Sequence, residues 1–244
     1  MSNSDFSAKS LAFLNALKRH NNREWFRARR DKYEAYVREP MIALVERLSE
    51  DLRLFAPDLV ASPKTSIYRI YRDTRFSANK TPLKIHVSAI FPHRLLSKHG
   101  GAGLYIEISG KRVLIGGGLY RPEPKDLNRV RAHIGENYTE LRNILEESRF
   151  KRNFGSLSGA QLKRIPRGFA LNHPAGELLR FKQFLVGCER PAEFATSTRF
   201  YASLLRLFRQ VSPLIHFLNT PLADWEPSRE ESVTMDDLLN IPNA

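Results

Sequence analysis

Hydrophobic residues within the first 55 positions recur every three or four residues, which is the spacing of one face of an α-helix. The first such run follows Ser10 and predicts a short amphipathic helix that ends near His20. Asn21, with Glu24 three residues later, has the form of a capping box, so we expect a second helix to begin there. The clearest helix opens at Pro40, which suits a first turn, and carries Met41, Leu44, Val45, Leu48, Leu52 and Phe55 on one face.

Between residues 66 and 118 the period changes to two, the spacing of one face of a β-strand. Ile67–Arg72 and Ile85–Phe91 each predict a strand, and Gly103–Gly116 predicts a hairpin that turns at Ser109–Lys111. In the first strand of that hairpin, Leu104, Ile106 and Ile108 alternate with Tyr105, Glu107 and Ser109. No helical pattern separates these strands, so we expect a largely antiparallel sheet over about residues 66–118.

The rest of the hydrophobic pattern is mostly helical. We expect a helix that opens at Pro122–Lys125, a second capping box at Asn137–Glu140 and a short helix over Pro174–Phe184. Ser197–Leu218 predicts a long helix, because its hydrophobic residues form one broad stripe. The fold class is therefore α+β, with a central, largely antiparallel sheet packed by N-terminal and C-terminal helices. We expect one domain over residues 1–220.

Composition indicates a chain that can build a hydrophobic core without crossing a membrane. Apolar residues make up 42% of the 244 residues, but no apolar run approaches the length of a membrane span. The N-terminus lacks the charged and apolar regions of a signal peptide. Cys188 is the only cysteine, so no intrachain disulfide can form. We therefore expect a cytoplasmic protein that has no membrane partner.

The net charge of +13 is unevenly distributed along the chain. Residues 221–244 hold six acids and one base, a net charge of −5, which leaves +18 for residues 1–220. We expect this acidic tail to be loosely ordered. The basic remainder favours nucleic acid, phosphorylated ligands or anionic surfaces, although a basic surface with no specific partner is the plain alternative.

Cationic side chains gather in the segment between the first two predicted strands. Guanidinium and ammonium groups suit phosphate or carboxylate, and hydroxyl groups add hydrogen bonds. We expect Arg72, Arg75 and Lys80 to converge on one accessible concavity that holds a phosphate-sized anion. The alternative is that these cations pair with acids such as Glu107 or Glu123 and brace the sheet. The candidate anion-binding residues are Arg69, Arg72, Asp73, Arg75, Ser77, Lys80 and Lys84.

Three successive glycines follow the hairpin and offer a floor for this ligand. We expect Gly116, Gly117, Gly118 and Tyr120 to line the concavity. A tight strand exit, packed by a neighbouring strand, is the alternative. The glycines match neither a Walker loop nor a dinucleotide fingerprint. The seven histidines are scattered without the spacing of metal ligands, so we expect no metal and no cofactor.

Four ordered segments together resemble the DUF2461 family of uncharacterised conserved proteins. The resemblance covers roughly residues 6–220, and the family implies no activity that can be transferred. The chain differs from the family pattern at Leu83, Ile85 and Asn172, which argues against roles for a phenol, a hydroxyl or a carboxylate there. The segments are Phe13–Phe26, Arg69–Lys84, Gly116–Pro124 and Leu162–Phe184.

Two classes of function follow from these patterns. The first is a binding module for a phosphate-bearing or other anionic ligand, or for nucleic acid, held by the segment Arg69–Lys84. The second is an enzyme acting on a phosphorylated or carboxylated substrate, with Asp73 or a histidine as the acid–base group. We favour binding, because no complete catalytic constellation is present in the sequence. No pattern in the sequence selects an oligomeric state.

Overall fold

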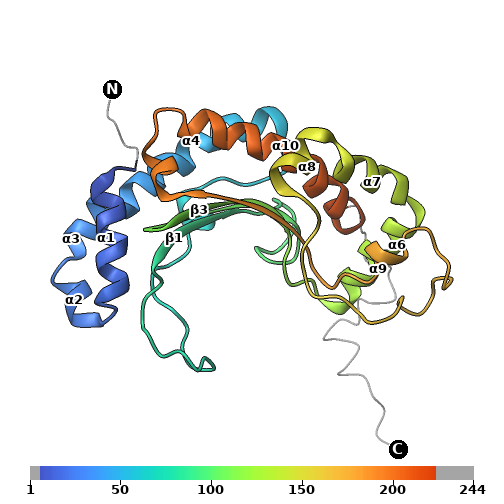
Figure 1. The fold of residues 1–244 in the computed structure, drawn as a ribbon, viewed down its shortest axis with the longest axis horizontal. Helices are drawn as coiled ribbons and strands as arrows, with labels where there is room; N and C mark the ends of the chain where they lie inside the picture. The colour runs from blue at the N-terminus through green and yellow to red at the C-terminus, as the bar shows by residue number, and fades with distance from the viewer. Residues whose placement is uncertain (1–5, 224–244) are drawn as a thin grey trace, which may run out of the picture.

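A curved four-stranded antiparallel sheet forms the centre of the computed structural model, which describes residues 6–223 (Figure 1). The strands lie in the order β1-β2-β3-β4, so each pairs with its neighbour in sequence. They span β1 His86–Phe91, β2 Gly103–Ser109, β3 Arg112–Leu119 and β4 Phe184–Pro191. The α+β class and the antiparallel sheet are confirmed, and β2 and β3 form the expected hairpin.

Helices lie over the convex side of the sheet and at its two ends, and loops connect them (Figure 1). In the described residues, no helix is both long and apolar enough to cross a membrane.

The N-terminal elements are α1 Ala8–Arg19, α2 Arg23–Arg27, α3 Arg30–Tyr33, the π-helix η1 Glu34–Arg38, α4 Glu39–Phe55 and α5 Pro63–Ser66. The later elements are α6 Pro124–Glu136, α7 Tyr138–Glu146, α8 Ser148–Phe154, α9 Gly176–Leu179, the 3₁₀ helix η2 Ala192–Thr196 and α10 Phe200–Ala223.

The composition of the sheet differs from the expectation in two places. Ile67–Arg72 is not a regular strand. It forms isolated β-bridges instead of a continuous ladder, and one of these bridges joins Ile67 to Ala89 of β1. The fourth strand of the sheet, β4, was not predicted. It begins at Phe184, the residue where the short helix was expected to end. Helix α9 covers only part of that predicted helix. Gly187 breaks the hydrophobic run of β4, which is why the strand pattern was missed.

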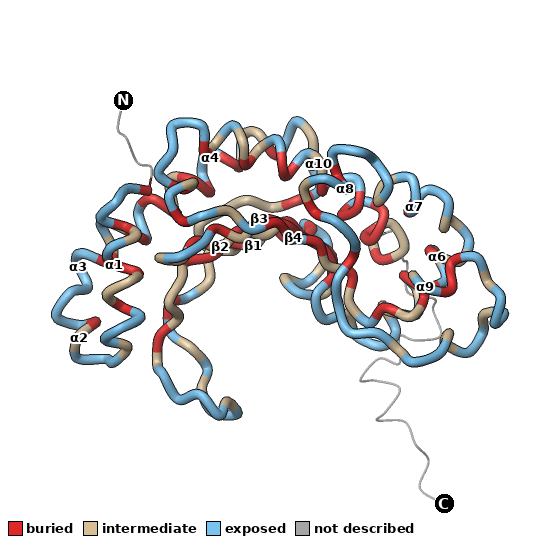
Figure 2. Tube along the Cα trace, viewed as in Figure 1, coloured by how far each residue is buried: buried red, intermediate tan, exposed pale blue. Residues whose placement is uncertain are grey.

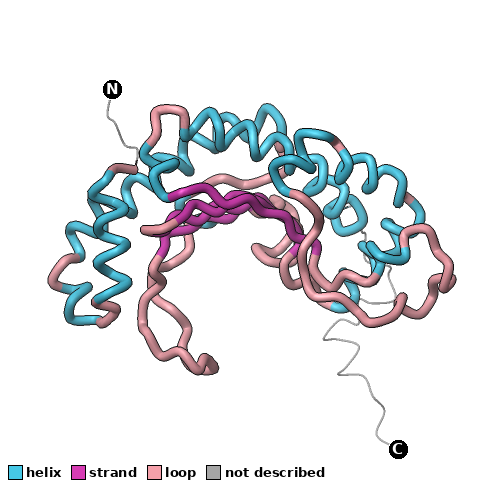
Figure 3. The backbone as a smooth tube through the Cα atoms, in the orientation of Figure 1, coloured by secondary structure: helices cyan, strands magenta, loops and turns pink. Residues whose placement is uncertain are grey.

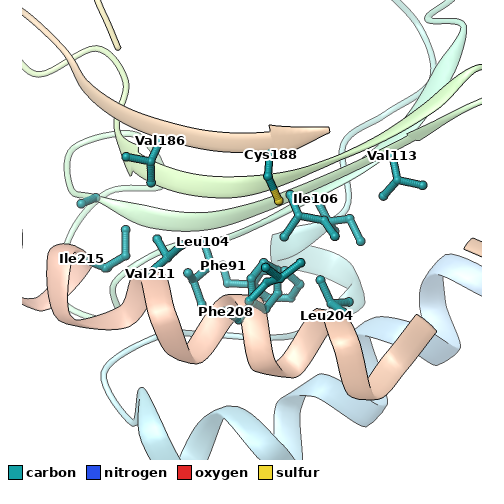
Figure 4. Close-up of a cluster of buried hydrophobic side chains, with 14 of the residues drawn as sticks. Phe91, Leu104, Ile106, Val113, Val186, Cys188, Leu204, Phe208, Val211 and Ile215 are labelled. Carbon is teal, nitrogen blue, oxygen red and sulfur yellow. The ribbon is translucent and has the colours of Figure 1, made fainter. Parts of the chain in front are cut away.

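The core lies between the sheet and the two long helices α4 and α10, which cover its convex side (Figure 1). Alternate residues of each strand point towards α10, and the Phe91 and Phe208 rings meet edge to face with centroids 5.5 Å apart. Burying each such large apolar side chain contributes about 1.5–3 kcal/mol. Buried positions follow the sheet and the inner sides of the helices (Figure 2). Figure 4 shows the contact through Phe91, Leu104, Ile106, Val113, Val186, Cys188, Leu204, Phe208, Val211 and Ile215.

Residues 67–85 leave the sheet as a loop that projects away from the helical layer, and we call this segment the arm (Figure 3). Its two sides are joined by the Tyr71–Leu83 bridge and by the Lys84 amide, which donates to the Ile70 carbonyl at 2.8 Å. Asn21 holds the returning side. Its Nδ2 donates to the Leu83 carbonyl at 2.9 Å, and its Oδ1 accepts from the Leu83 amide at 3.0 Å.

The helix caps differ from both predicted capping boxes. Asn22 is the N-cap of α2, with its Oδ1 accepting from the Trp25 amide at 2.8 Å, so the expected cap at Asn21 is wrong. Asn137 stands at the N-cap position of α7, but its side chain bonds to His133 instead of the helix amides. The expected acidic tail lies outside the described residues, apart from its first three, which complete α10.

Candidate functional site

The side of the sheet opposite α10 carries polar side chains at its centre, and we call it the open face. Alternation along β2 points Leu104, Ile106 and Ile108 into the core and turns Tyr105 and Glu107 to the open face. The strand register places Tyr105 beside Ile90 and Gly116, and Glu107 beside Ser88 and Leu114. The open face therefore presents an aromatic side chain, a charged side chain and the backbone of a glycine on neighbouring strands.

Tyr68 is the centre of a cluster of cationic and aromatic side chains on this face. The Tyr68 amide donates to the Ser88 carbonyl at 3.0 Å, which fixes this residue beside β1. The ammonium groups of Lys84 and Lys98 lie 4.7 and 4.5 Å from its ring centroid. The His99 ring stacks on Tyr68 at 5.9 Å, and the Tyr105 ring approaches at 6.4 Å with its edge. We call Tyr68, Lys84, Lys98, His99 and Tyr105 the Tyr68 cluster.

The two lysines of the cluster are partly withdrawn from water and close to further positive charge. Burial lowers the pKa of Lys84, and the charges of Arg69 and Lys98 lower it further, while the charge of Glu107 opposes these effects without cancelling them. Burial also lowers the pKa of Lys98, whose ammonium donates to the Thr65 carbonyl. Neither lysine has a carboxylate within salt-bridge distance among the residues that the structure describes. An anion placed here would offset both the desolvation and the repulsion.

The aromatic groups of the cluster are in a similar environment. Burial raises the pKa of Tyr68 to about 12, with a smaller effect from Tyr120, so the phenol is neutral at physiological pH. Burial lowers the pKa of His99, and the charges of Lys98 and Arg121 act in the same direction. His99 is therefore a neutral ring near neutral pH, and the positive charge of the cluster comes from the two lysines.

Glu107 interacts with side chains from its own strand and from the two strands beside it. Its Oε2 accepts from the Tyr105 hydroxyl at 3.1 Å and lies 3.6 Å from His86 Nε2. Its Oε1 lies 3.7 Å from an Arg112 nitrogen, and Arg112 also pairs with Glu189. Burial lowers the pKa of His86, and the opposing effect of Glu107 is smaller. The ion pairs of Glu107 are thus with residues of the sheet, and its charge also acts on Lys84 at the base of the arm, as the bracing alternative expects in part.

The cations near the tip of the arm donate to groups of the arm itself. Arg75 binds both oxygens of Asp73, at 3.1 and 2.8 Å, and this pairing holds the pKa of Asp73 at about 2. Arg72 donates to the hydroxyl groups of Thr81 and Ser77 at 2.5 and 3.4 Å. Lys80 donates to the backbone carbonyl of Thr74 at 3.0 Å. Of these three cations, only Arg75 is neutralised by a carboxylate.

The glycines lie at the other end of the sheet from the tip of the arm. Gly116 and Gly117 are level with Tyr105 and Leu104, and so with the end of β1 at Phe91, whereas the arm joins β1 at His86. The expectation that the arm tip and the glycine floor share one concavity is wrong, because the length of strand β1 separates them. Lys84, at the base of the arm, is the predicted anion-binding residue that reaches the Tyr68 cluster.

The close approach of β4 accounts for the glycines of β3. A Cβ atom at Gly116 would lie 2.0 Å from the Val186 carbonyl oxygen, and one at Gly118 would lie 1.9 Å from that of Phe184. Gly118 also has a φ of 131°, which side chains disfavour. Tight packing of β4 thus requires glycine with or without a ligand. Tyr120, just beyond β3, is half exposed and lies under the Arg121 guanidinium.

Sequence reasoning missed Lys98 and His99 altogether. They lie in the connection between β1 and β2, where no periodic pattern marks them. Tyr105 and Glu107 gave a usable signal, because polar residues alternate there with buried ones. The side of the sheet on which they gather became clear only when α10 was seen to cover the opposite side (Figure 1).

Two cavities of the described residues lie on the helical side. One of about 290 Å³ is lined by the α4–α5 connection and by α10, including His93 and His216. A second of about 680 Å³ lies among α7, α8 and α10. Neither contains a residue of the Tyr68 cluster. Over residues 6–223, no three His, Cys, Asp or Glu side chains gather closely enough to hold a metal ion.

Comparison with known proteins identifies the family. No curated protein matches the sequence. The family model described as conserved hypothetical protein DUF2461 matches residues 9–217, a span that includes the sheet, the arm and most of α10. The chain therefore belongs to the DUF2461 family.

Proposed function

We propose that this protein binds a phosphate-bearing ligand on the open face of its sheet, with Lys84 and Lys98 as the principal contacts. The observation that carries the proposal is the approach of both ammonium groups to one ring, at 4.7 and 4.5 Å from the Tyr68 centroid. Two like charges in a half-buried position repel one another, and an anion between them lowers that free energy. Arg69 adds to the positive potential, since its charge lowers the pKa of Lys84.

The aromatic side chains favour a ligand that carries a ring as well as a phosphate. Tyr68 and Tyr105 lie beside the lysines, and the half-exposed Tyr120 acts on Tyr68 electrostatically. A planar base can stack on such rings while its phosphate accepts hydrogen bonds from the ammonium groups. A nucleotide combines these two features, so it is the first ligand to test.

Isothermal titration with a nucleoside triphosphate and with inorganic phosphate tests the proposal. We expect the double variant Lys84→Gln/Lys98→Gln to weaken binding by at least tenfold per lysine, since a charge-assisted hydrogen bond contributes about 1.5–3 kcal/mol. The matched control is Lys18→Gln/Lys151→Gln, which removes the same charge from α1 and α8 and is expected to bind as the parent does. Equal affinity of both double variants, or no binding by the parent protein, contradicts the proposal.

An enzyme is the second candidate, and the Glu107 network favours it. Asp73 is poorly suited to proton transfer near neutral pH, because Arg75 holds its pKa at about 2. His86, with Glu107 3.6 Å away, is the better acid–base group on the open face. Phosphorus NMR of a bound nucleotide tests this: a new phosphate signal that forms with the parent protein and not with His86→Gln supports an enzyme.

We also propose a cytoplasmic location. Cys188 is buried in β4 and free, and burial raises the pKa of its thiol, so it is poorly reactive. A chain without disulfides suits a reducing compartment.

A further inference from the structure

A second aromatic and cationic group lies at the tip of the arm, outside the Tyr68 cluster. Phe76 is 95% exposed, and the Arg75 guanidinium lies 5.7 Å from its ring centroid. Tyr71, between this tip and Tyr68, is 43% exposed. The Tyr71 ring also packs edge-on against Phe26, with centroids 5.9 Å apart, but a free nucleotide bound at the Tyr68 cluster would leave the Phe76 ring without a role.

Aromatic rings and cations alternate along the arm from its base to its tip. Tyr68, Tyr71 and Phe76 follow one another, with Arg69 and Arg72 between them. Tyr71 lies about 10 Å along an extended chain from Tyr68, at about 3.3 Å per residue. The base and the tip are therefore separate positions along one path, and the path begins at the lysines of the Tyr68 cluster.

The charges along this path remain available to an anion. Asp73 neutralises Arg75, so the phosphate contacts at the tip fall to Arg72 and Lys80, which bond to hydroxyl and carbonyl oxygens. Both can exchange these neutral partners for phosphate oxygens. The Asp73–Arg75 pair then serves to hold the guanidinium near Phe76.

We infer that the ligand is a single-stranded nucleic acid, which runs from the Tyr68 cluster along the arm to Phe76. This inference rests on the proposed function and extends it from one nucleotide to several. A single strand presents unpaired bases and phosphates in alternation, which matches the alternation of rings and cations. A duplex hides the faces of its bases and so cannot stack on exposed rings. The net charge of +18 over residues 1–223 suits a polyanion.

Fluorescence anisotropy with a labelled oligothymidylate of about 12 nucleotides tests the inference, since comparable single-strand sites cover about 4–16 nucleotides. We expect the oligomer to bind more tightly than thymidine triphosphate. Phe76→Ala is expected to weaken oligomer binding by about 5- to 150-fold, the effect of one lost stacked base, and to leave triphosphate binding unchanged. Phe76 makes few contacts within the protein, so this variant is expected to fold normally.

Two further variants separate stacking from general effects. Leu171→Ala removes another strongly exposed hydrophobic side chain, distant in sequence from the arm, and is expected to bind the oligomer as the parent does. Lys84→Gln/Lys98→Gln is expected to weaken both ligands. It should also reduce the slope of log affinity against log salt by about 1.4 for the oligomer, at about 0.7 per phosphate contact.

The outcomes distinguish the inference from the proposed function beneath it. Oligomer affinity that is unchanged in Phe76→Ala, no tighter than triphosphate affinity, or exceeded by that of a duplex overturns the inference. If the lysine variant still loses triphosphate binding in that case, the proposed function stands. Failure of the parent protein to bind either ligand overturns both.

Discussion

Lys84 and Arg75 carry the same charge, but their surroundings give them different roles. Lys84 is half-buried near Arg69 and Lys98, and burial and repulsion together lower its pKa by more than the charge of Glu107 raises it. Arg75 is fully exposed and bound to both oxygens of Asp73, so its charge is balanced and screened by water. A count of cations along the sequence treats the two alike. Their partners identify Lys84 as the residue that would gain more from an anion.

The titration of Asp73 offers a direct check on this contrast. The pKa of the Asp73 carboxyl falls from 3.8 to about 2, mainly because it accepts hydrogen bonds from the Arg75 side chain and amide. A lowered folded pKa stabilises the fold above pH 3.8, and that stabilisation disappears as pH falls towards 2. We expect carbon NMR to give a midpoint near 2 in the parent protein and a midpoint closer to 3.8 in Arg75→Ala.

Arg72→Ala is the control, because Arg72 bonds to Thr81 and Ser77 and not to Asp73. The Asp73 midpoint should stay near 2 in this variant. A parent midpoint near 3.8 would show that Arg75 does not pair with Asp73 in solution, and Arg75 would then be free to bind an anion.

At the scale of elements, the arm depends on a contact that is remote in sequence. Asn21, between α1 and α2, exchanges two hydrogen bonds with the backbone of Leu83 on the returning side of the arm. Asn22, its neighbour, caps α2 through the Trp25 amide. Two adjacent asparagines thus serve different elements, one the helix and the other the base of the arm.

Replacing Asn21 should loosen the arm without unfolding the protein. Each of the two lost hydrogen bonds costs about 0.5–1.5 kcal/mol, so Asn21→Ala should raise local opening of the arm by about 5- to 150-fold. Limited digestion with trypsin measures this through the rate of cleavage after Lys80. Asn22→Ala removes only the helix cap, so trypsin should cleave this variant after Lys80 at the parent rate. Equal rates in all three proteins would mean that other contacts hold the arm.

The sequence predicted those elements whose own residues determine them. The β2–β3 hairpin and helix α4 follow their hydrophobic periods closely, and Pro40 stands in the first turn of α4 as expected. Strand β4 was missed because Gly187 breaks its hydrophobic run and because its pairing with β3 depends on glycines that are distant in sequence, among them Gly116. The Asn21 contact spans a sequence separation of 62 residues and has no local signature.

The candidate site was predictable only in part, because some of its residues are brought together by contacts that are remote in sequence. The cation-rich segment was visible in the sequence, but its members fall into two groups, with Lys84 at the Tyr68 cluster and Arg72 near the tip of the arm. Lys98 and His99 join the cluster through the fold alone. Residue type gave the chemistry of the site, and its location depended on tertiary contacts that no local pattern encodes.

At the scale of the whole molecule, hydrophobic and charged functions occupy opposite sides of one sheet. Helices α4 and α10 cover the convex side and bury the core, which extends from Phe6 to Leu222 (Figure 2). The cationic and aromatic residues gather on the open face and the arm. Substitutions in the Tyr68 cluster should therefore alter binding more than stability, whereas substitutions facing α10 should do the reverse.

The acidic residues after Ala223 should weaken the binding of any polyanion to this basic body. A chain that ends at Ala223 changes the net charge from +13 to +18, and it keeps every residue of the described core. We expect an unchanged melting temperature and tighter binding of the oligothymidylate. The gain should be largest at about 0.01 M salt, where charges interact over about 30 Å, and should shrink at 0.15 M, where that distance is about 8 Å.

A full-length variant separates the charge of this segment from its bulk. Replacing its acids by their amides raises the net charge by a similar amount and keeps the chain length; the positions are Asp224, Glu226, Glu230, Glu231, Asp236 and Asp237. If charge is the cause, this variant and the shortened chain should bind equally tightly at low salt, because both remove the same repulsion of phosphate. Tighter binding by the shortened chain alone would indicate that the segment obstructs the ligand sterically. Weaker binding by either protein would mean that the acidic segment supports the site, and the electrostatic argument for the whole molecule would then be wrong.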